Sequence, residues 1–120
     1  MKPGIYDFTI YQGAPFSKSI ALKDADGNAV DLTGYNVRLQ ARESYGDSIK
    51  IIDWSSEGES PVLSIPTPGN GIINVSATPV ITAGLDFEIC LYDVEVYTEA
   101  DADVLRILQG VVNLSKEVTI

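Results

Sequence analysis

Asp24, Asp26 and Asn28 are the residues of this sequence whose types and spacing come closest to a metal site. Their oxygens match the first, third and fifth ligand positions of a calcium-binding loop. Such a loop needs glycine at its sixth position and a bidentate glutamate at its twelfth, whereas this sequence has Ala29 and Tyr35 there. The pattern therefore favours a polar turn between strands, with a weak calcium site as the alternative.

Pairs of acidic residues at positions i and i+2 recur along the chain, and paired carboxylates serve as acid and base in glycoside hydrolysis. The pairs are Asp24/Asp26, Glu57/Glu59, Asp93/Glu95 and Asp101/Asp103. All of them fall in predicted turns, loops or strands, where such spacing is typical of a solvated surface. The sequence also lacks histidine, the usual general base and the commonest metal ligand. We therefore predict a protein that is not an enzyme and has no catalytic residues, cofactor or metal.

Composition and charge narrow the class of protein further. A length of 120 residues predicts a single domain, 1–120, and 45% hydrophobic with 21% charged residues is globular composition. No stretch approaches the roughly 18 consecutive apolar residues of a membrane helix, so we expect no membrane insertion. With 17 acidic and 8 basic residues the net charge is −9, which disfavours nucleic acid as a partner. The single cysteine, Cys90, lies in an apolar run and is predicted to be buried.

Alternation of apolar and polar residues, bounded by Gly, Pro, Asn and Asp, is the main structural signal. It predicts an all-β fold, an antiparallel β-sandwich of immunoglobulin-like or jelly-roll-like type. The predicted strands cover residues 5–12, 16–23, 35–42, 48–54, 62–65, 71–77, 86–97 and 104–115. One short helical turn near 79–84 should cross between the sheets, because a Thr-Pro pair opens it and a glycine follows. Gly110, inside the last run, predicts a bulge or a close backbone approach.

Aromatic side chains supply the candidate binding residues. Tyr and Trp are enriched at protein interfaces, although they also pack in sandwich cores. The candidate protein interface consists of Tyr6, Phe8, Tyr11, Tyr45 and Trp54. Among them Tyr45 and Trp54 border polar loops, which favours exposed positions. The first strand, 5–12, and the terminal residues 117–120 are the predicted docking edges, since unpaired edges accept a partner strand.

The stretch "DFTIYQGAPFSKSIAL" followed by "KDADGNAVDLTGYNVRLQAR" resembles a known family. It looks like the small β-sandwich domains of tailed-bacteriophage tail and baseplate proteins, similar to the N-terminal domain of siphophage upper-baseplate proteins. The resemblance continues through "GNGIINVSATPVITAGL" and "YDVEVYTEADADVLRILQGVVNLSKEVT" and so spans nearly the whole chain. Those relatives continue into a further region, which suggests a stand-alone adaptor or decoration subunit here.

The resemblance implies a virion structural protein, made in the host cytoplasm, that docks to other virion proteins and forms a possible homo-oligomer. The expected location is the tail, baseplate or fibre-attachment region. Two alternatives stay open: a capsid decoration protein, and a carbohydrate-binding module in which Tyr45 and Trp54 stack on sugars at the host surface.

Overall fold

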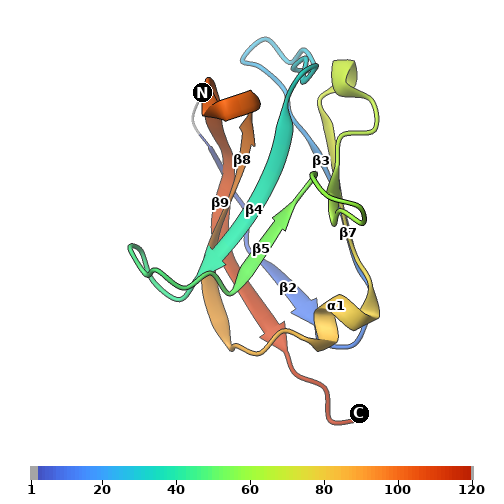
Figure 1. The fold of residues 1–120 in the computed structure, drawn as a ribbon, viewed down its shortest axis with the longest axis vertical. Helices are drawn as coiled ribbons and strands as arrows, with labels where there is room; N and C mark the ends of the chain where they lie inside the picture. The colour runs from blue at the N-terminus through green and yellow to red at the C-terminus, as the bar shows by residue number, and fades with distance from the viewer. Residues whose placement is uncertain (1–2, 120) are drawn as a thin grey trace.

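Two β-sheets pack face to face as the layers of a sandwich (Figure 1). The computed structural model describes residues 3–119. Its elements, in chain order, are β1 (Gly4–Ile5), β2 (Phe8–Tyr11), β3 (Phe16–Ala21), β4 (Asn36–Arg42), β5 (Ile52–Ser55), β6 (Leu63–Ser64), the 3-10 turn η1 (Pro68–Asn70), β7 (Ile72–Ala77), α1 (Pro79–Ala83), β8 (Ile89–Tyr97), the 3-10 turn η2 (Glu99–Asp101) and β9 (Val104–Ser115). The all-β sandwich predicted from the sequence is confirmed.

The two sheets differ in strand number and in strand direction. One sheet runs β1-β9-β8-β4-β5, with β2 continuing beside β9, and the other runs β3-β7-β6. In the first sheet β8 lies between β9 and β4, and in the second sheet β7 lies between β3 and β6. The first sheet is mixed, because β1 and β2 run parallel to β9, whereas the remaining pairings are antiparallel. The expectation of wholly antiparallel sheets was wrong at this edge.

Alternating side chains give each sheet one buried face. In β4, Val37, Leu39 and Ala41 point into the sandwich, and the polar residues between them are half-buried on the outer face. The strands of the second sheet contribute Leu63 and Ile73 to the same hydrophobic cluster. Burying such a side chain stabilises the fold by about 1.5–3 kcal/mol, so the two inner faces hold the layers together.

The predicted helical turn near 79–84 is confirmed as α1, which leads from β7 in one sheet to β8 in the other. The Thr78 hydroxyl caps it by accepting a hydrogen bond from the Ile81 amide at 3.4 Å. Thr82, fully buried, donates its hydroxyl to the Ala14 carbonyl at 2.8 Å and accepts from the Gly13 amide at 3.1 Å. The helix therefore anchors the turn between β2 and β3.

The acidic stretch at residues 24–28 forms the predicted turn. One Asp24 carboxylate oxygen accepts the amide hydrogens of Asp26 at 2.9 Å and Asn28 at 3.0 Å. Gly27 has a φ of 84°, which an L side chain adopts only at a cost. This carboxylate thus satisfies the backbone of its own turn.

Gly110 permits a close approach of the first strand to the last, as the sequence predicts. A Cβ at Gly110 would lie 2.2 Å from the Tyr6 carbonyl oxygen. That carbonyl accepts the Tyr92 hydroxyl, and the adjacent Asp7 carboxylate accepts the Val111 amide at 2.8 Å. The predicted strand 5–12 is therefore divided into β1 and β2. The pairing of β8 with β9 is irregular elsewhere, at a register shift between Val94 and Glu95.

Two further segments differ from the predicted boundaries. The strand expected over 48–54 begins only at Ile52, because Arg42 donates to the Asp47 carbonyl at 2.6 Å and holds residues 43–51 as a loop. Residues 117–119 of the expected terminal edge form no strand, and Ile120 lies outside the described residues.

Candidate protein-interaction surfaces

A shallow polar groove of about 330 Å³ lies on the outer face of the first sheet. Its walls come from β4, β8, β9 and the loop after β4. The lining residues are Gln40, Arg42, Ser44, Tyr45, Gly46, Leu91, Tyr92, Asp93, Glu95, Arg106 and Gln109. Register explains the gathering: Gln40, Asp93 and Gln109 lie directly opposite one another on three neighbouring strands. Their side chains consequently share one face.

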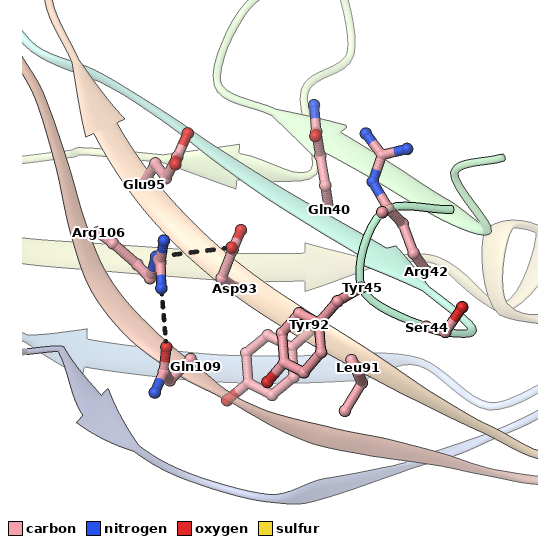
Figure 2. Close-up of a pocket in the computed structure, with 11 residues that line it drawn as sticks. Gln40, Arg42, Ser44, Tyr45, Leu91, Tyr92, Asp93, Glu95, Arg106 and Gln109 are labelled. Atoms are coloured by element: carbon pink, nitrogen blue, oxygen red, sulfur yellow. Dashed lines mark hydrogen bonds and ion pairs between the residues drawn. The ribbon is translucent and has the colours of Figure 1, made fainter. Parts of the chain in front are cut away.

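Figure 2 shows Arg106 between Asp93 and Gln109 on the floor of this groove. Its guanidinium lies 3.8 Å from the Asp93 carboxylate and donates to the Gln109 side-chain oxygen at 3.2 Å. Burial, followed by the repulsion of Glu95, raises the pKa of Asp93 even though Arg106 acts in the opposite direction. The groove floor therefore carries both signs of charge and offers donors and acceptors.

Tyr45 stands at the rim of the groove, on the loop that connects β4 to β5. The ring is 88% exposed. Arg42 fixes the base of this loop through its bond to Asp47, and the Asp47 amide in turn donates to the Ser44 carbonyl at 3.2 Å. The loop therefore holds an aromatic ring beside polar side chains.

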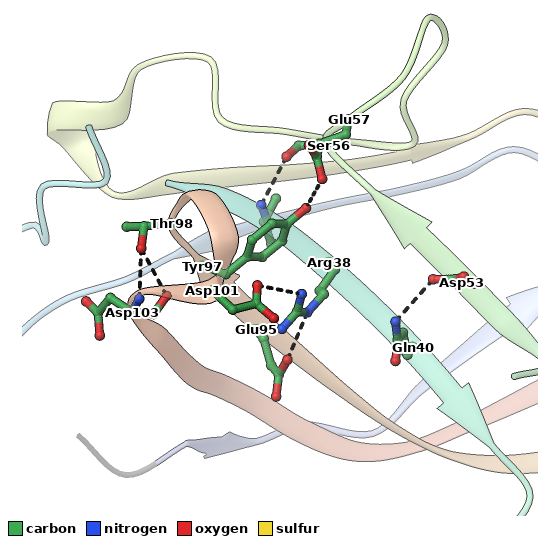
Figure 3. Close-up of polar contacts among 11 residues, drawn as sticks. Arg38, Gln40, Asp53, Ser56, Glu57, Glu95, Tyr97, Thr98, Asp101 and Asp103 are labelled. Carbon is green, nitrogen blue, oxygen red and sulfur yellow. Dashed lines mark hydrogen bonds and ion pairs between the residues drawn. The ribbon is translucent and has the colours of Figure 1, made fainter. Parts of the chain in front are cut away.

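A second polar cluster centres on Arg38 of β4, beside the β8–β9 hairpin loop (Figure 3). Arg38 bonds Glu95 at 2.9 Å and Asp101 at 3.3 Å, and its guanidinium carbon lies 4.3 Å from the centroid of the Tyr97 ring. The Tyr97 hydroxyl donates to Glu57. Burial and this hydrogen bond raise the pKa of Tyr97 to about 12. The cluster holds the hairpin loop and the segment after β5 against β4.

The β1–β2 edge carries exposed apolar and aromatic side chains. Ile5 is 79% exposed and Tyr11 is 63% exposed, both on the outer side of the sheet. Tyr6, 43% exposed, stacks on Phe8 with ring centroids 6.3 Å apart. The Lys18 ammonium lies 3.8 Å from the centroid of the Tyr6 ring, so the ring bridges the edges of the two sheets.

The structure separates the five aromatic residues predicted as an interface. Tyr6, Tyr11 and Tyr45 are exposed, and only Tyr6 and Phe8 are stacked on each other. Phe8 and Trp54 belong to the core, with 9% and 8% of their surfaces exposed, so the prediction of an exposed Trp54 was wrong. The strand alternation around Trp54 explains its burial, because it points inward like Ile52 while its neighbours on either side point out.

The sequence patterns did not predict the groove. Arg42, Arg106 and Gln109 belong to the outward-facing sets of their strands, and the alternation of β4 marks that set as half-exposed. Which outward side chains of β4, β8 and β9 become neighbours depends on strand order and register.

Within residues 3–119, His, Cys, Asp and Glu side chains nowhere gather in groups of three or more as a bound metal would require. Across the same residues no helix is long and apolar enough to cross a membrane. A scan against protein-family models finds no match for this chain, and a search of the curated proteins finds no relative.

Proposed function

We propose that this protein is a non-enzymatic structural component of a bacteriophage virion. It docks to other virion proteins in the tail, baseplate or fibre-attachment region. The resemblance of residues 7–42, 69–85 and 92–119 to tail and baseplate β-sandwich domains suggests the virion, and the surface of the first sheet suggests how docking occurs.

The observation that carries the proposal is the exposed β1–β2 edge. The large side chains of Ile5, Tyr6 and Tyr11 are exposed along β1 and β2. The backbone of these two strands pairs with β9 on one side and, among the described residues, with no strand on the other. Aromatic anchors beside an open edge suit a protein interface, because the rings lose little conformational entropy and the backbone offers hydrogen bonds. Docking of this kind needs no catalytic group.

Fractionation of phage particles tests the location. Heads, tails and unassembled lysate would be separated and the protein quantified in each by mass spectrometry. A fixed copy number with tails is the expected result. Recovery with heads would favour the alternative of capsid decoration, and recovery only in the unassembled lysate would overturn the virion assignment.

Substitutions at the edge test the contact. Ile5→Ser and Tyr11→Ser should lower the amount of protein incorporated into tails. Ile49→Ser is the matched control, because Ile49 is 68% exposed but lies just before β5, at the opposite edge of the first sheet. Equal incorporation of all three variants would remove the edge from the interface.

Carbohydrate binding at the groove is a second candidate function. Tyr45 beside Gln40 and Gln109 resembles the combination of a stacking ring and amide groups that binds sugars. Trp54 is buried and therefore takes no part in this proposed sugar-binding site. Shifts of groove amides in nuclear magnetic resonance spectra, elicited by a host glycan and abolished by Tyr45→Ala, would support it. The absence of shifts across a glycan panel would refute it.

A further inference from the structure

The edge of β3 that faces away from β7 is open. The Leu22 amide donates to the Gly71 carbonyl at 2.9 Å, just beyond the paired strands. Backbone groups alternate sides in an antiparallel ladder, so the amides and carbonyls of Ser17, Ser19 and Ala21 point away from β7. Among residues 3–119 no backbone or side-chain group bonds to them, and these residues are exposed.

The topology explains why this edge has no neighbour. In an immunoglobulin constant-type sandwich the first strand lies beside the second strand, which corresponds here to β3. In this protein the first strand pairs instead with the last, as β1 and β2 beside β9. Because β1 and β2 pair with β9, no strand lies beside the outer edge of β3 in the described residues.

β3 also lacks most of the features that protect the other edges. Such protection comes from short strands, breaks and charged side chains, whether on the edge or pointing inward, and of these β3 has only the inward-pointing Lys18. β6 has two residues, β5 has four and carries Asp53 on its outer side, and the β1–β2 edge is broken at Asp7. β3 has six residues in one run, and its outward side chains are small and uncharged. It is thus the longest unbroken edge for strand addition.

The inward side of β3 indicates what a partner would meet. Phe16 and Ile20 pack against the core but remain partly exposed, and Lys18 lies between them. The Lys18 ammonium contacts the Tyr6 ring and has no carboxylate within ion-pair distance in the described part of the chain. An added strand would cover the two apolar side chains and would place one residue opposite this unpaired charge.

We propose that β3 accepts an extended segment of a partner protein by β-augmentation, and that the segment carries an acidic residue opposite Lys18 between apolar residues opposite Phe16 and Ile20. Main-chain bonds to Ser17, Ser19 and Ala21 supply affinity, and Lys18 supplies specificity. This site is a second contact surface for the docking function proposed above. The inference rests on that function only in requiring that the protein has a protein partner.

A second copy of this chain fits the site poorly. In the antiparallel register that pairs all the free positions of two β3 strands, Lys18 of one copy meets Ile20 of the other, and the neighbouring registers place it opposite Lys18 or Leu22. Each arrangement leaves an ammonium group without a carboxylate, and like charges opposite each other are destabilising. The net charge of −9 adds repulsion between copies.

A designed peptide tests the site on the isotope-labelled full chain. The probe is a capped peptide of about seven residues, long enough at about 3.4 Å per residue to span the six residues of β3, in which threonine alternates with valine and glutamate takes the central valine position. The expected result is a set of chemical-shift changes and slowed amide exchange at Ser17, Ser19 and Ala21. Ser19→Pro, which removes one edge amide and leaves the ladder with β7 intact, should abolish both, whereas Ser19→Ala should not.

Charge exchange tests the specificity. Replacing the central glutamate of the peptide by lysine should weaken binding about tenfold, and Lys18→Glu should reverse the preference between the two peptides. Unfolding curves of each variant verify that the fold is retained.

Several results would overturn the inference. These are no shift at millimolar peptide, shifts confined to the β1–β2 edge or the groove, equal affinity for both peptides, or protection of the β3 amides by self-association without peptide. Particle fractionation reads location alone and the peptide titration reads the β3 edge alone, so the failure of one proposal is distinguishable from failure of the other.

Discussion

Replacing Gly110 by alanine places a methyl group where the first strand crosses the last. The new Cβ would lie 2.2 Å from the Tyr6 carbonyl oxygen and 2.8 Å from an Asp7 carboxylate oxygen. Carbon–oxygen contacts are ordinarily about 3.3 Å or longer, so the segment between β1 and β2 must move by about 1 Å. Backbone rather than a flexible side chain blocks the space, and the strain cannot be relieved by a rotamer change.

The cost follows from the contacts that this movement disturbs. Overpacking a tight site costs about 1–3 kcal/mol. Weakening the Tyr92 hydroxyl bond to Tyr6 and the Val111 amide bond to Asp7 adds about 1 kcal/mol for each bond fully lost. Alanine reduces the entropy of the unfolded chain and so offsets about 0.4–1 kcal/mol. The free energy of unfolding should therefore fall by about 2–4 kcal/mol, a large share of a typical domain's 5–15 kcal/mol.

Urea unfolding followed by tryptophan fluorescence measures this change. The chain contains a single tryptophan, Trp54, and its ring is 8% exposed, so its emission reports the loss of the core. The midpoint should fall by about 1–3 M urea with little change in slope. Hydrogen exchange at the Val111 amide should accelerate more than exchange in β4.

Gly69→Ala is the matched control. A Cβ at Gly69 meets no atom within 4 Å, and its φ is not positive. Its free energy of unfolding should stay within about 0.5 kcal/mol of the wild type. If Gly110→Ala were equally neutral, the close approach of the first strand to β9 would not constrain the fold and the reasoning would be refuted.

Three further variants have defined expected outcomes. Thr82→Val keeps the side-chain shape but leaves the half-buried Gly13 amide and Ala14 carbonyl of the β2–β3 turn without their side-chain partner. The free energy of unfolding should fall by about 1–3 kcal/mol, and a urea midpoint equal to wild type would contradict this. The raised pKa of Asp93 means that the native state binds its proton more tightly than the unfolded state, so stability is lost as pH rises through that pKa. Asp93→Asn should therefore unfold at higher urea at neutral pH, with the difference vanishing below the ordinary pKa of 3.8; an unchanged difference across a pH series would count against it. The same sign holds for Tyr97, whose pKa is raised by burial and by the bond to Glu57: its contribution is complete below pH 10.0 and is lost as pH approaches about 12. Tyr97→Phe should therefore flatten the alkaline decline in stability measured by circular dichroism. An identical decline would exclude the Tyr97 hydroxyl as its source.

Local patterns in the sequence determined several elements. The alternation in residues 36–42 predicted β4 and its buried face, because side chains on a strand point to opposite sides in turn. The Thr-Pro opening and the following glycine predicted α1, since capping and the fixed φ of proline act within a few residues. The polar run between β8 and β9 predicted their hairpin for a similar reason: short connections join antiparallel neighbours.

Only the tertiary structure decided how the edges are used. Nothing local in residues 5–12 distinguishes pairing with β3 from parallel pairing with β9, because the same alternation satisfies either neighbour. That choice divides the first strand at Asp7, brings Tyr6 over Gly110 and leaves β3 open. At Trp54 the local pattern was sufficient, because its alternation with Asp53 indicated an inward position. The prediction of an exposed ring gave more weight to the adjoining polar loop. The sequence by itself thus determined which side chains share a face, whereas strand order and register, which depend on contacts about a hundred residues apart such as Asp7 with Val111, determined which faces and edges are free.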